Sequence, residues 1–202
     1  WGFARTLLIE HSELKSQIID LDPSSDVNIQ ARFLFEDLIS LSDETQIVRR
    51  AELLYIPQIK NKKLDAGTWS VNPKASYLVT GGLGGLGIEM GEWLSTQGAK
   101  HLVLMGRGEP NAESAKKIEA MSAKGTRVLI VLGDVGKVED VKNVFLSIKK
   151  QKMPELRGVI HSAGVLADGA FLNQSWESYE KVMSPKITGS WNLHEQSKAM
   201  NL

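Results

Sequence analysis

From Ser76 onward the sequence alternates between short apolar segments and longer amphipathic ones. The apolar segments have the length of strands, and the amphipathic segments repeat their apolar residues with a helical period. Strands are expected at 76–81, 101–106, 127–134 and 156–164, and helices at 86–97, 112–123, 138–150, 176–183 and 187–199. Continuously apolar strands separated by helices are typical of a parallel sheet that is covered on both faces. The sequence therefore predicts an α/β fold with a doubly wound parallel sheet.

Residues 1–63 have a different pattern. They contain a strand candidate at 16–22, a helical stretch at 27–41 and two short extended pieces between 45 and 59. We therefore expect a smaller, partial subdomain at 1–63, a polar linker at 64–75 and a larger α/β subdomain at 76–202. Both ends of the sequence read as parts of folded segments, so we expect the chain to be a fragment of a longer protein.

The composition excludes several kinds of partner. The 24 basic and 24 acidic residues cancel, which argues against nucleic acid and anionic membranes as partners. No apolar run is long enough to cross a bilayer. The chain has no cysteine, which excludes disulfides and thiolate metal sites and is compatible with a reducing cytosol. We expect a cytoplasmic location and no bound metal.

A glycine-rich loop lies between the first expected strand and its helix, in the segment TGGLGGLG. Glycine permits a tight turn and lets the backbone approach a pyrophosphate, while the helix N-terminus offers free N–H groups. This context favours a dinucleotide cradle in a Rossmann-like fold over a purely structural turn. The candidate residues are Thr80, Gly81, Gly82, Leu83, Gly84, Gly85, Leu86 and Gly87.

The end of the second strand bears on the choice between NAD and NADP. The strand ends in Gly106, Arg107 and Gly108, and an arginine at this place accommodates the 2′-phosphate of NADP. A solvated loop arginine is the alternative, and Glu109 leaves NAD open. The third strand ends at Asp134 and Val135, where the aspartate either faces the adenine or caps the next helix. The fourth ends in Ser162, Ala163 and Gly164, which are small enough to approach a cofactor, with an ordinary glycine turn as the alternative.

Five segments taken together carry a family resemblance: YLVTGGLGGLG, LVLMGRG, GDV, GVIHSAGVLADG and SPKITGSWNLHE. They closely resemble the ketoreductase domain of modular polyketide synthases, which belongs to the extended short-chain dehydrogenase/reductase superfamily. The segments WGFARTLLIEH, IIDLD and IVRRAELLYIPQI resemble the truncated Rossmann-like structural subdomain of the same family. The resemblance covers nearly the whole chain.

The resemblance implies a role for each candidate residue. It implies that Thr80–Gly87 wrap the pyrophosphate of NADPH, with Gly106 and Arg107 beside the 2′-phosphate. Asp134 and Val135 would flank the adenine, and Ser162–Gly164 would lie along the nicotinamide ribose. The substrate would be a β-ketoacyl chain tethered to the phosphopantetheine of an acyl carrier protein, and the other partners would be neighbouring synthase domains.

The resemblance also implies that Lys186, in the SPK segment, is the catalytic lysine, with a solvated lysine near a helix start as the alternative. The family's serine and tyrosine are expected on the next strand and helix, beyond residue 202, so we expect this chain to be inactive by itself. Tyr179 is expected to pack in the core. The alternative is a non-catalytic, architectural ketoreductase-like module of a synthase.

One loop bears on stereochemistry in the resembled family. Ketoreductases of the B-type, which set the D-hydroxyl, carry Leu-Asp-Asp after the turn that resembles HSAG. This sequence has Leu166, Ala167 and Asp168 there, which keeps the final aspartate and loses the middle one. The resemblance therefore favours B-type reduction, with an ordinary loop aspartate as the alternative.

Four further residues are expected to have structural roles. His161 lies beside the cofactor turn but matches a position that is usually structural in the resembled family. Trp93, Trp176 and Trp191 fall in expected helices, and we expect them to pack against the sheet.

Overall fold

A computed structural model of the chain describes residues 1–40, 42–63 and 70–202. Its internal contacts divide the chain into two compact units. The smaller unit comprises Trp1–Ala66 and Gly169–Gln174, and the larger comprises Gly67–Asp168 and Ser175–Leu202. The first part of the expected linker, 64–69, lies outside the described residues. The subdivision into 1–63, 64–75 and 76–202 stays a prediction.

The larger unit is built on four parallel strands, as the sequence predicts. They are β4 (Ser76–Thr80), β5 (His101–Gly106), β6 (Arg127–Leu132) and β7 (Leu156–His161), in the spatial order β6-β5-β4-β7. Helices α3 (Gly85–Thr96), α4 (Ala112–Ala123) and α5 (Val138–Lys150) connect successive strands. The strand order reverses between β4 and β7. Loops at the carboxyl ends of these two strands diverge, and doubly wound folds bind ligands there.

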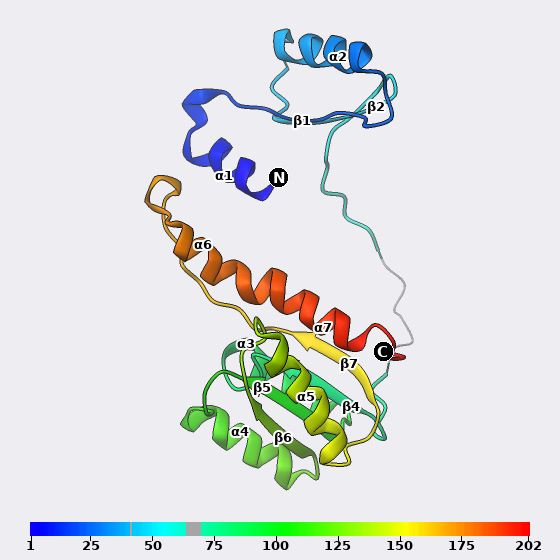
Figure 1. Cartoon of the computed structure of the whole chain (residues 1–202), viewed down its shortest axis with the longest axis vertical. Coiled ribbons are helices and arrows are strands. Elements are labelled where there is room, and N and C mark those ends of the chain that lie inside the picture. The colour runs from blue at the N-terminus through cyan, green and yellow to red at the C-terminus, as the bar shows by residue number, and fades with distance from the viewer. Residues whose placement is uncertain (41, 64–69) are drawn as a thin grey trace. The chain divides into compact units, whose positions relative to one another are not determined.

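Strand residues alternate between two apolar layers, because successive side chains point to opposite faces of a sheet. Leu78 and Val103 belong to the layer that also contains the inner face of α5. Tyr77 and Val79 belong to the layer shared with α3 and Met121 of α4. The central strands are therefore buried on both sides, and helices cover both faces of the sheet (Figure 1).

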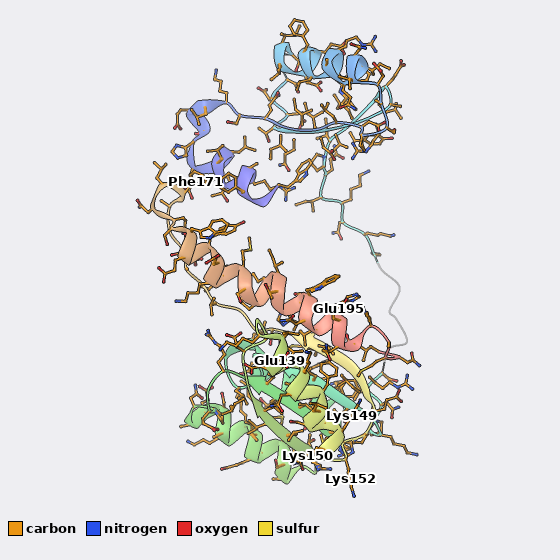
Figure 2. The ribbon with its side chains drawn as sticks, viewed as in Figure 1. Glu139, Lys149, Lys150, Lys152, Phe171 and Glu195 are labelled. Carbon is orange, nitrogen blue, oxygen red and sulfur yellow. The ribbon has the colours of Figure 1, made fainter. Side chains whose placement is uncertain are left out.

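Helix α5 shows how sequence pattern and packing agree. Its buried residues repeat at helical spacing and are Val141, Val144, Phe145 and Ile148. Glu139 and Asp140 lie in the first turn, and Lys149 and Lys150 lie in the last. Figure 2 shows Glu139 and the two lysines near opposite ends of the helix. This arrangement of charge complements the helix dipole.

The C-terminal helical stretch has three parts. Helix α6 (Trp176–Met183) is followed by the π-helical segment η3 (Ser184–Gly189) and by α7 (Ser190–Ser197). Pro185 accounts for the wider turn, because proline has no N–H and its ring clashes with the carbonyl four residues earlier. The expected α-helix at 187–199 was therefore wrong over its first residues. Asn192 and Leu193 are the buried residues of α7.

The aromatic residues of these helices are more exposed than expected. Trp93, Trp176 and Trp191 are 42%, 71% and 62% exposed, so their expected packing against the sheet was wrong. Tyr179 is 41% exposed and stacks on Trp176, with ring centroids 5.6 Å apart. It is not a core residue. A helical period locates an apolar face, but it does not say which of two apolar faces meets the sheet.

The smaller unit contains a three-stranded sheet. Strand β2 (Gln46–Arg50) pairs parallel with β1 (Ile18–Asp20) and antiparallel with β3 (Leu53–Tyr55). The other elements of this unit are α1 (Gly2–Glu10), η1 (Ser12–Leu14), α2 (Val27–Ile39) and η2 (Phe171–Asn173). Phe171, labelled in Figure 2, belongs to this unit because its ring packs edge-on against Phe3, with centroids 4.8 Å apart.

A buried ion pair connects α2 to β2. Asp37 is only 2% exposed, and Arg49 Nε donates to its Oδ2 at 3.0 Å. The Arg49 guanidinium also lies 4.9 Å from the ring centroid of Phe33. The pairing satisfies a charge that would be costly to bury alone. No helix in the described part of the chain is long and apolar enough to span a membrane.

Candidate cofactor site

A cavity of about 610 Å³ lies at the carboxyl ends of the strands in the larger unit. It is formed by the loops that follow β4, β5, β6 and β7, together with the start of η3. All of the predicted cofactor residues line it apart from Gly82 and Gly87. The structure thus brings the segments TGGLGGLG, MGRG, GDV and SAG to one edge of the sheet.

Gly82 and Gly87 have packing roles inside the loop. The N–H of Gly82 donates to the carbonyl of Met105 at 3.0 Å, which connects the loop to β5. A Cβ on Gly82 would lie 2.7 Å from the carbonyl oxygen of Val79, and one on Gly87 would overlap the carbonyl of Gly81. Gly81 itself has φ +67°, a conformation that favours glycine. These three positions fix the path of the turn.

Gly84 and Gly85 line the cavity and have open space beside them. A Cβ added at either residue would have no atom within 4 Å. Gly84 is the N-cap of α3, and no side chain caps that helix end. The first N–H groups of α3 are therefore available to an anion at the positive end of the helix dipole.

Arg107 supplies positive charge to the same cavity. Its side chain makes no hydrogen bond or ion pair with any residue in the described ranges, and the residue is exposed. Glu109 also lines the cavity. Gly106 packs closely, because a Cβ there would lie 2.9 Å from Leu83 Cδ1. A free guanidinium beside unpaired helix N–H groups is an arrangement suited to more than one phosphate.

Asp134 does not cap helix α5. Its Oδ1 accepts a hydrogen bond from Gly136 N at 2.9 Å, and its own N–H donates to Asp140 Oδ2 at 2.8 Å. The N-cap of α5 is Lys137, which provides no side-chain cap. The capping alternative was therefore wrong. Asp134 lines the cavity together with Val135.

The turn after β7 is tied to the end of β4. Ser162 Oγ donates to the carbonyl of Thr80 at 2.6 Å, and Thr80 is fully buried. A Cβ on Gly81 would lie 2.8 Å from Ala163 N, so the two loops are in close contact. The side chains of Thr80 and Ser162 therefore hold the cavity wall together through hydrogen bonds to protein groups.

Besides Gly82 and Gly87, three predicted residues do not line the cavity: Lys186, Leu166 and Asp168. Lys186 is exposed, and its carbonyl accepts a hydrogen bond from Ser190 Oγ at 2.6 Å. Its neighbour Pro185 does line the cavity, as do Lys181 and Ser184, which sequence reasoning missed. Lys181, Ser184 and Pro185 lie at i, i+3 and i+4, and this helical spacing was the signal that the sequence offered for them. Among the described residues no group of histidines and acids could hold a metal ion.

Comparison with known proteins identifies the family. The family model described as "KR domain" matches residues 75–202, which is the part of the chain that contains the cavity. The chain belongs to this family. KR stands here for the ketoreductase domains of polyketide synthases, so the resemblance seen in the sequence is confirmed.

Curated relatives of the KR domain are large synthases. One of the phenolphthiocerol/phthiocerol polyketide synthase subunits of Mycobacterium tuberculosis is 31% identical over 96% of this chain. A 6-methylsalicylic acid synthase of Arthrobotrys oligospora is 30% identical over the same share. The chain spans only 11% and 12% of those proteins.

Solved ketoreductases have the same fold. An A-type ketoreductase from a modular polyketide synthase is 29% identical and superposes with a TM-score of 0.86. The match covers 100% of this chain and 43% of that structure. An N-terminal ketoreductase from the macrolactin assembly line gives 27% identity and a TM-score of 0.80, and covers 99% and 40%. The predicted Rossmann-like α/β fold is confirmed.

Proposed function

We propose that this KR domain is part of an NADPH-dependent β-ketoacyl reductase. It would reduce the β-keto group of an acyl chain on an acyl carrier protein to a β-hydroxyl. One observation carries the proposal: the free guanidinium of Arg107 and the uncapped N-terminus of α3 line the same cavity. The N-terminus of α3 follows β4, at the switch point of the sheet, and Arg107 follows the neighbouring strand β5; together they suit a phosphorylated dinucleotide.

The residues of the cavity fit the cofactor in chemistry and in space. The open positions at Gly84 and Gly85 leave room for a pyrophosphate at the start of α3. Arg107 would hold the 2′-phosphate, which distinguishes NADPH from NADH. Asp134 and Val135 would flank the adenine, and the Ser162–Gly164 turn would lie along the nicotinamide ribose.

When bound, the cofactor would supply the hydride. Lys186 would hold the ribose hydroxyls. Its positive charge would also stabilise the phenolate that forms when the tyrosine implied by the family resemblance protonates the new alkoxide. Lys186 follows Pro185, which lines the cavity, so its backbone lies close to the cavity wall. Its long, flexible side chain has no partner among the described residues and is free to reach inward.

We further propose B-type stereochemistry, which gives the D-hydroxyl. The support is Asp168, which keeps the final aspartate of the Leu-Asp-Asp pattern, although Ala167 replaces the middle one. Chiral analysis of the reduced product tests this assignment. An L-hydroxyl product would contradict it while leaving the reductase activity intact.

The proposed partners follow from the relatives. Both curated relatives are polyketide or methylsalicylic acid synthases of which this chain spans a small share. We therefore propose that neighbouring synthase domains and an acyl carrier protein deliver the substrate in the cytoplasm. Arg107 and Lys181 supply positive charge to the cavity, which suits an anionic cofactor, and we propose no metal cofactor.

A direct assay tests the proposed activity. The ketoreductase domain that includes this chain is mixed with NADPH and a β-ketoacyl thioester, and cofactor oxidation is followed by absorbance. We expect oxidation that depends on the thioester and is faster with NADPH than with NADH. Absence of oxidation would favour the architectural alternative.

A further inference from the structure

His161, the last residue of β7, connects two segments that the proposed reaction needs. Its Nδ1 lies 2.6 Å from Thr80 Oγ1, at the end of β4, where the glycine-rich loop begins. Its Nε2 lies 2.9 Å from the carbonyl oxygen of Pro185, the residue before Lys186. One imidazole ring therefore bridges the glycine-rich loop and the π-helical segment η3.

The partners fix which nitrogen carries the proton in the neutral ring. A carbonyl oxygen can only accept, so Nε2–H must donate to Pro185. Nδ1 then accepts, and the donor is the hydroxyl of Thr80. The same hydroxyl lies 3.4 Å from Ala163 N, whose N–H points to it as a donor. A series of hydrogen bonds therefore runs from Ala163 through Thr80 and His161 to Pro185. It joins the SAG turn to η3, and both of these segments line the cofactor cavity.

The position of the Pro185 backbone determines where the side chain of Lys186 leaves the chain. Pro185 interrupts the regular helix, so the directions of the following side chains depend on the local π-helical geometry rather than on α-helical continuity. The Lys186 ammonium makes no hydrogen bond or ion pair within the described part of the chain. The side chain is therefore placed by its backbone, and His161 is the side chain that binds this backbone from the sheet.

We propose that His161 is a positioning residue for Lys186. By holding the Pro185 carbonyl against β7, it sets the distance from the Lys186 backbone to the glycine-rich loop, so that the ammonium reaches the cofactor ribose. This inference rests on the proposed role of Lys186. It gives His161 a part in catalysis that its structural position in the family resemblance does not imply.

Two substitutions separate the two hydrogen bonds of the ring. In His161→Gln the amide nitrogen reaches the place of Nε2 and keeps the donor to Pro185. In His161→Asn the amide oxygen reaches the place of Nδ1, which keeps the acceptor for Thr80 and loses the donor to Pro185. Both variants are polar and smaller than histidine, so similar denaturation midpoints would show that folding does not explain a difference between them.

Turnover is measured in the ketoreductase domain that includes this chain. We expect H161N to lower kcat about tenfold and H161Q to stay within about threefold of wild type. The KM for the thioester should change little in either. Equal losses in the two variants, or a loss confined to KM, would contradict the positioning role.

A double-mutant cycle shows whether His161 acts through Lys186. In the K186M background, H161N should lower kcat by less than about twofold, because the residue that it positions is already gone. Fully additive losses would overturn this inference alone. A K186M enzyme as active as wild type would contradict the proposed function, and with it the positioning of a catalytic lysine.

A spectroscopic measurement needs no turnover. Long-range ¹H–¹⁵N correlation spectra of the chain report which ring nitrogen of each histidine is protonated. We expect the Nε2–H form at His161, and the same form when Thr80 is replaced by valine, because the Pro185 carbonyl still requires a donor. An Nδ1–H form in the wild type would overturn the proposed direction of the hydrogen bonds.

Discussion

Asn192 Nδ2 on α7 donates a hydrogen bond of 3.0 Å to the carbonyl oxygen of Val135 in the loop after β6. Both residues are buried, with 7% and 4% of their surface exposed. Gly189 packs against the same valine, because a Cβ there would lie 2.8 Å from Val135 Cγ1. The C-terminal helix is thus fastened to a wall of the cofactor cavity.

Replacing Asn192 by leucine should lower the free energy of unfolding by about 1–3 kcal/mol, because the buried carbonyl of Val135 loses its donor. Urea denaturation followed by circular dichroism measures the change. Asn143→Leu is the matched control, since Asn143 is exposed on α5. Equal midpoints for the two variants would show that the buried hydrogen bond contributes little.

Two substitutions in the glycine-rich loop should act on different properties, one on stability and the other on cofactor binding. Gly87→Ala should destabilise the fold by about 2 kcal/mol or more, because the new Cβ overlaps the carbonyl of Gly81. Gly84→Ala should change stability by no more than about 1 kcal/mol, because its Cβ meets no atom. It should nevertheless weaken NADPH binding, since Gly84 lines the cavity at the N-terminus of α3. Thermal denaturation and cofactor titration distinguish the two effects, and a G84A variant with unchanged affinity would contradict the proposed path of the pyrophosphate.

Arg107 should determine the preference for NADPH. Arg107→Gln is expected to weaken NADPH binding by about tenfold to a hundredfold, or about 1.4–2.8 kcal/mol, and to leave NADH binding unchanged. Cofactor fluorescence gives both dissociation constants. Arg127→Gln is the control, since Arg127 starts β6 at the opposite edge of the sheet. Equal losses for NADPH and NADH would contradict the phosphate contact.

His101 should make folding sensitive to mild acid. Burial lowers the pKa of His101 below its ordinary value of 6.5, and the nearby Arg127 adds to this shift. Its Nδ1 is buried and finds no hydrogen-bond partner among the described residues. The unfolded chain therefore binds the proton more readily, so stability is full above pH 6.5 and falls as the pH drops toward the lowered pKa.

The test compares urea midpoints of the wild type and His101→Gln from about pH 8 to about pH 5. The wild type should lose more stability over that range than the variant. Parallel curves would show that another group accounts for the acid sensitivity.

Much of the fold could be predicted because strands and helices of the larger unit are marked by local patterns. The apolar run Val128–Leu132 and the helical spacing of Val141, Val144 and Ile148 each specify one element without reference to the rest of the chain. The cavity could be predicted too, since parallel strands bring their carboxyl ends to one edge.

The rest depends on contacts that residue spacing does not specify. Spacing alone did not separate the two possible roles of Asp134, contact with the adenine and capping of the next helix. Its hydrogen bonds to Gly136 and Asp140 exclude capping. The bridge from Thr80 through His161 to Pro185 joins residues that are far apart in sequence. The π-helical segment at Pro185 could have been suspected from the proline, but its extent depends on packing.

The central claim is that this domain transfers hydride from NADPH to the β-carbon of a β-ketoacyl chain. The ketoreductase domain that includes this chain is supplied with NADPH deuterated at the nicotinamide C4 and a β-ketoacyl group on an acyl carrier protein. Mass spectrometry of the released product locates the label. We predict deuterium on the carbon that bears the new hydroxyl. The K186M variant should show neither turnover nor labelled product. An unreduced ketone, or a reduced product without deuterium at that carbon, would contradict the account.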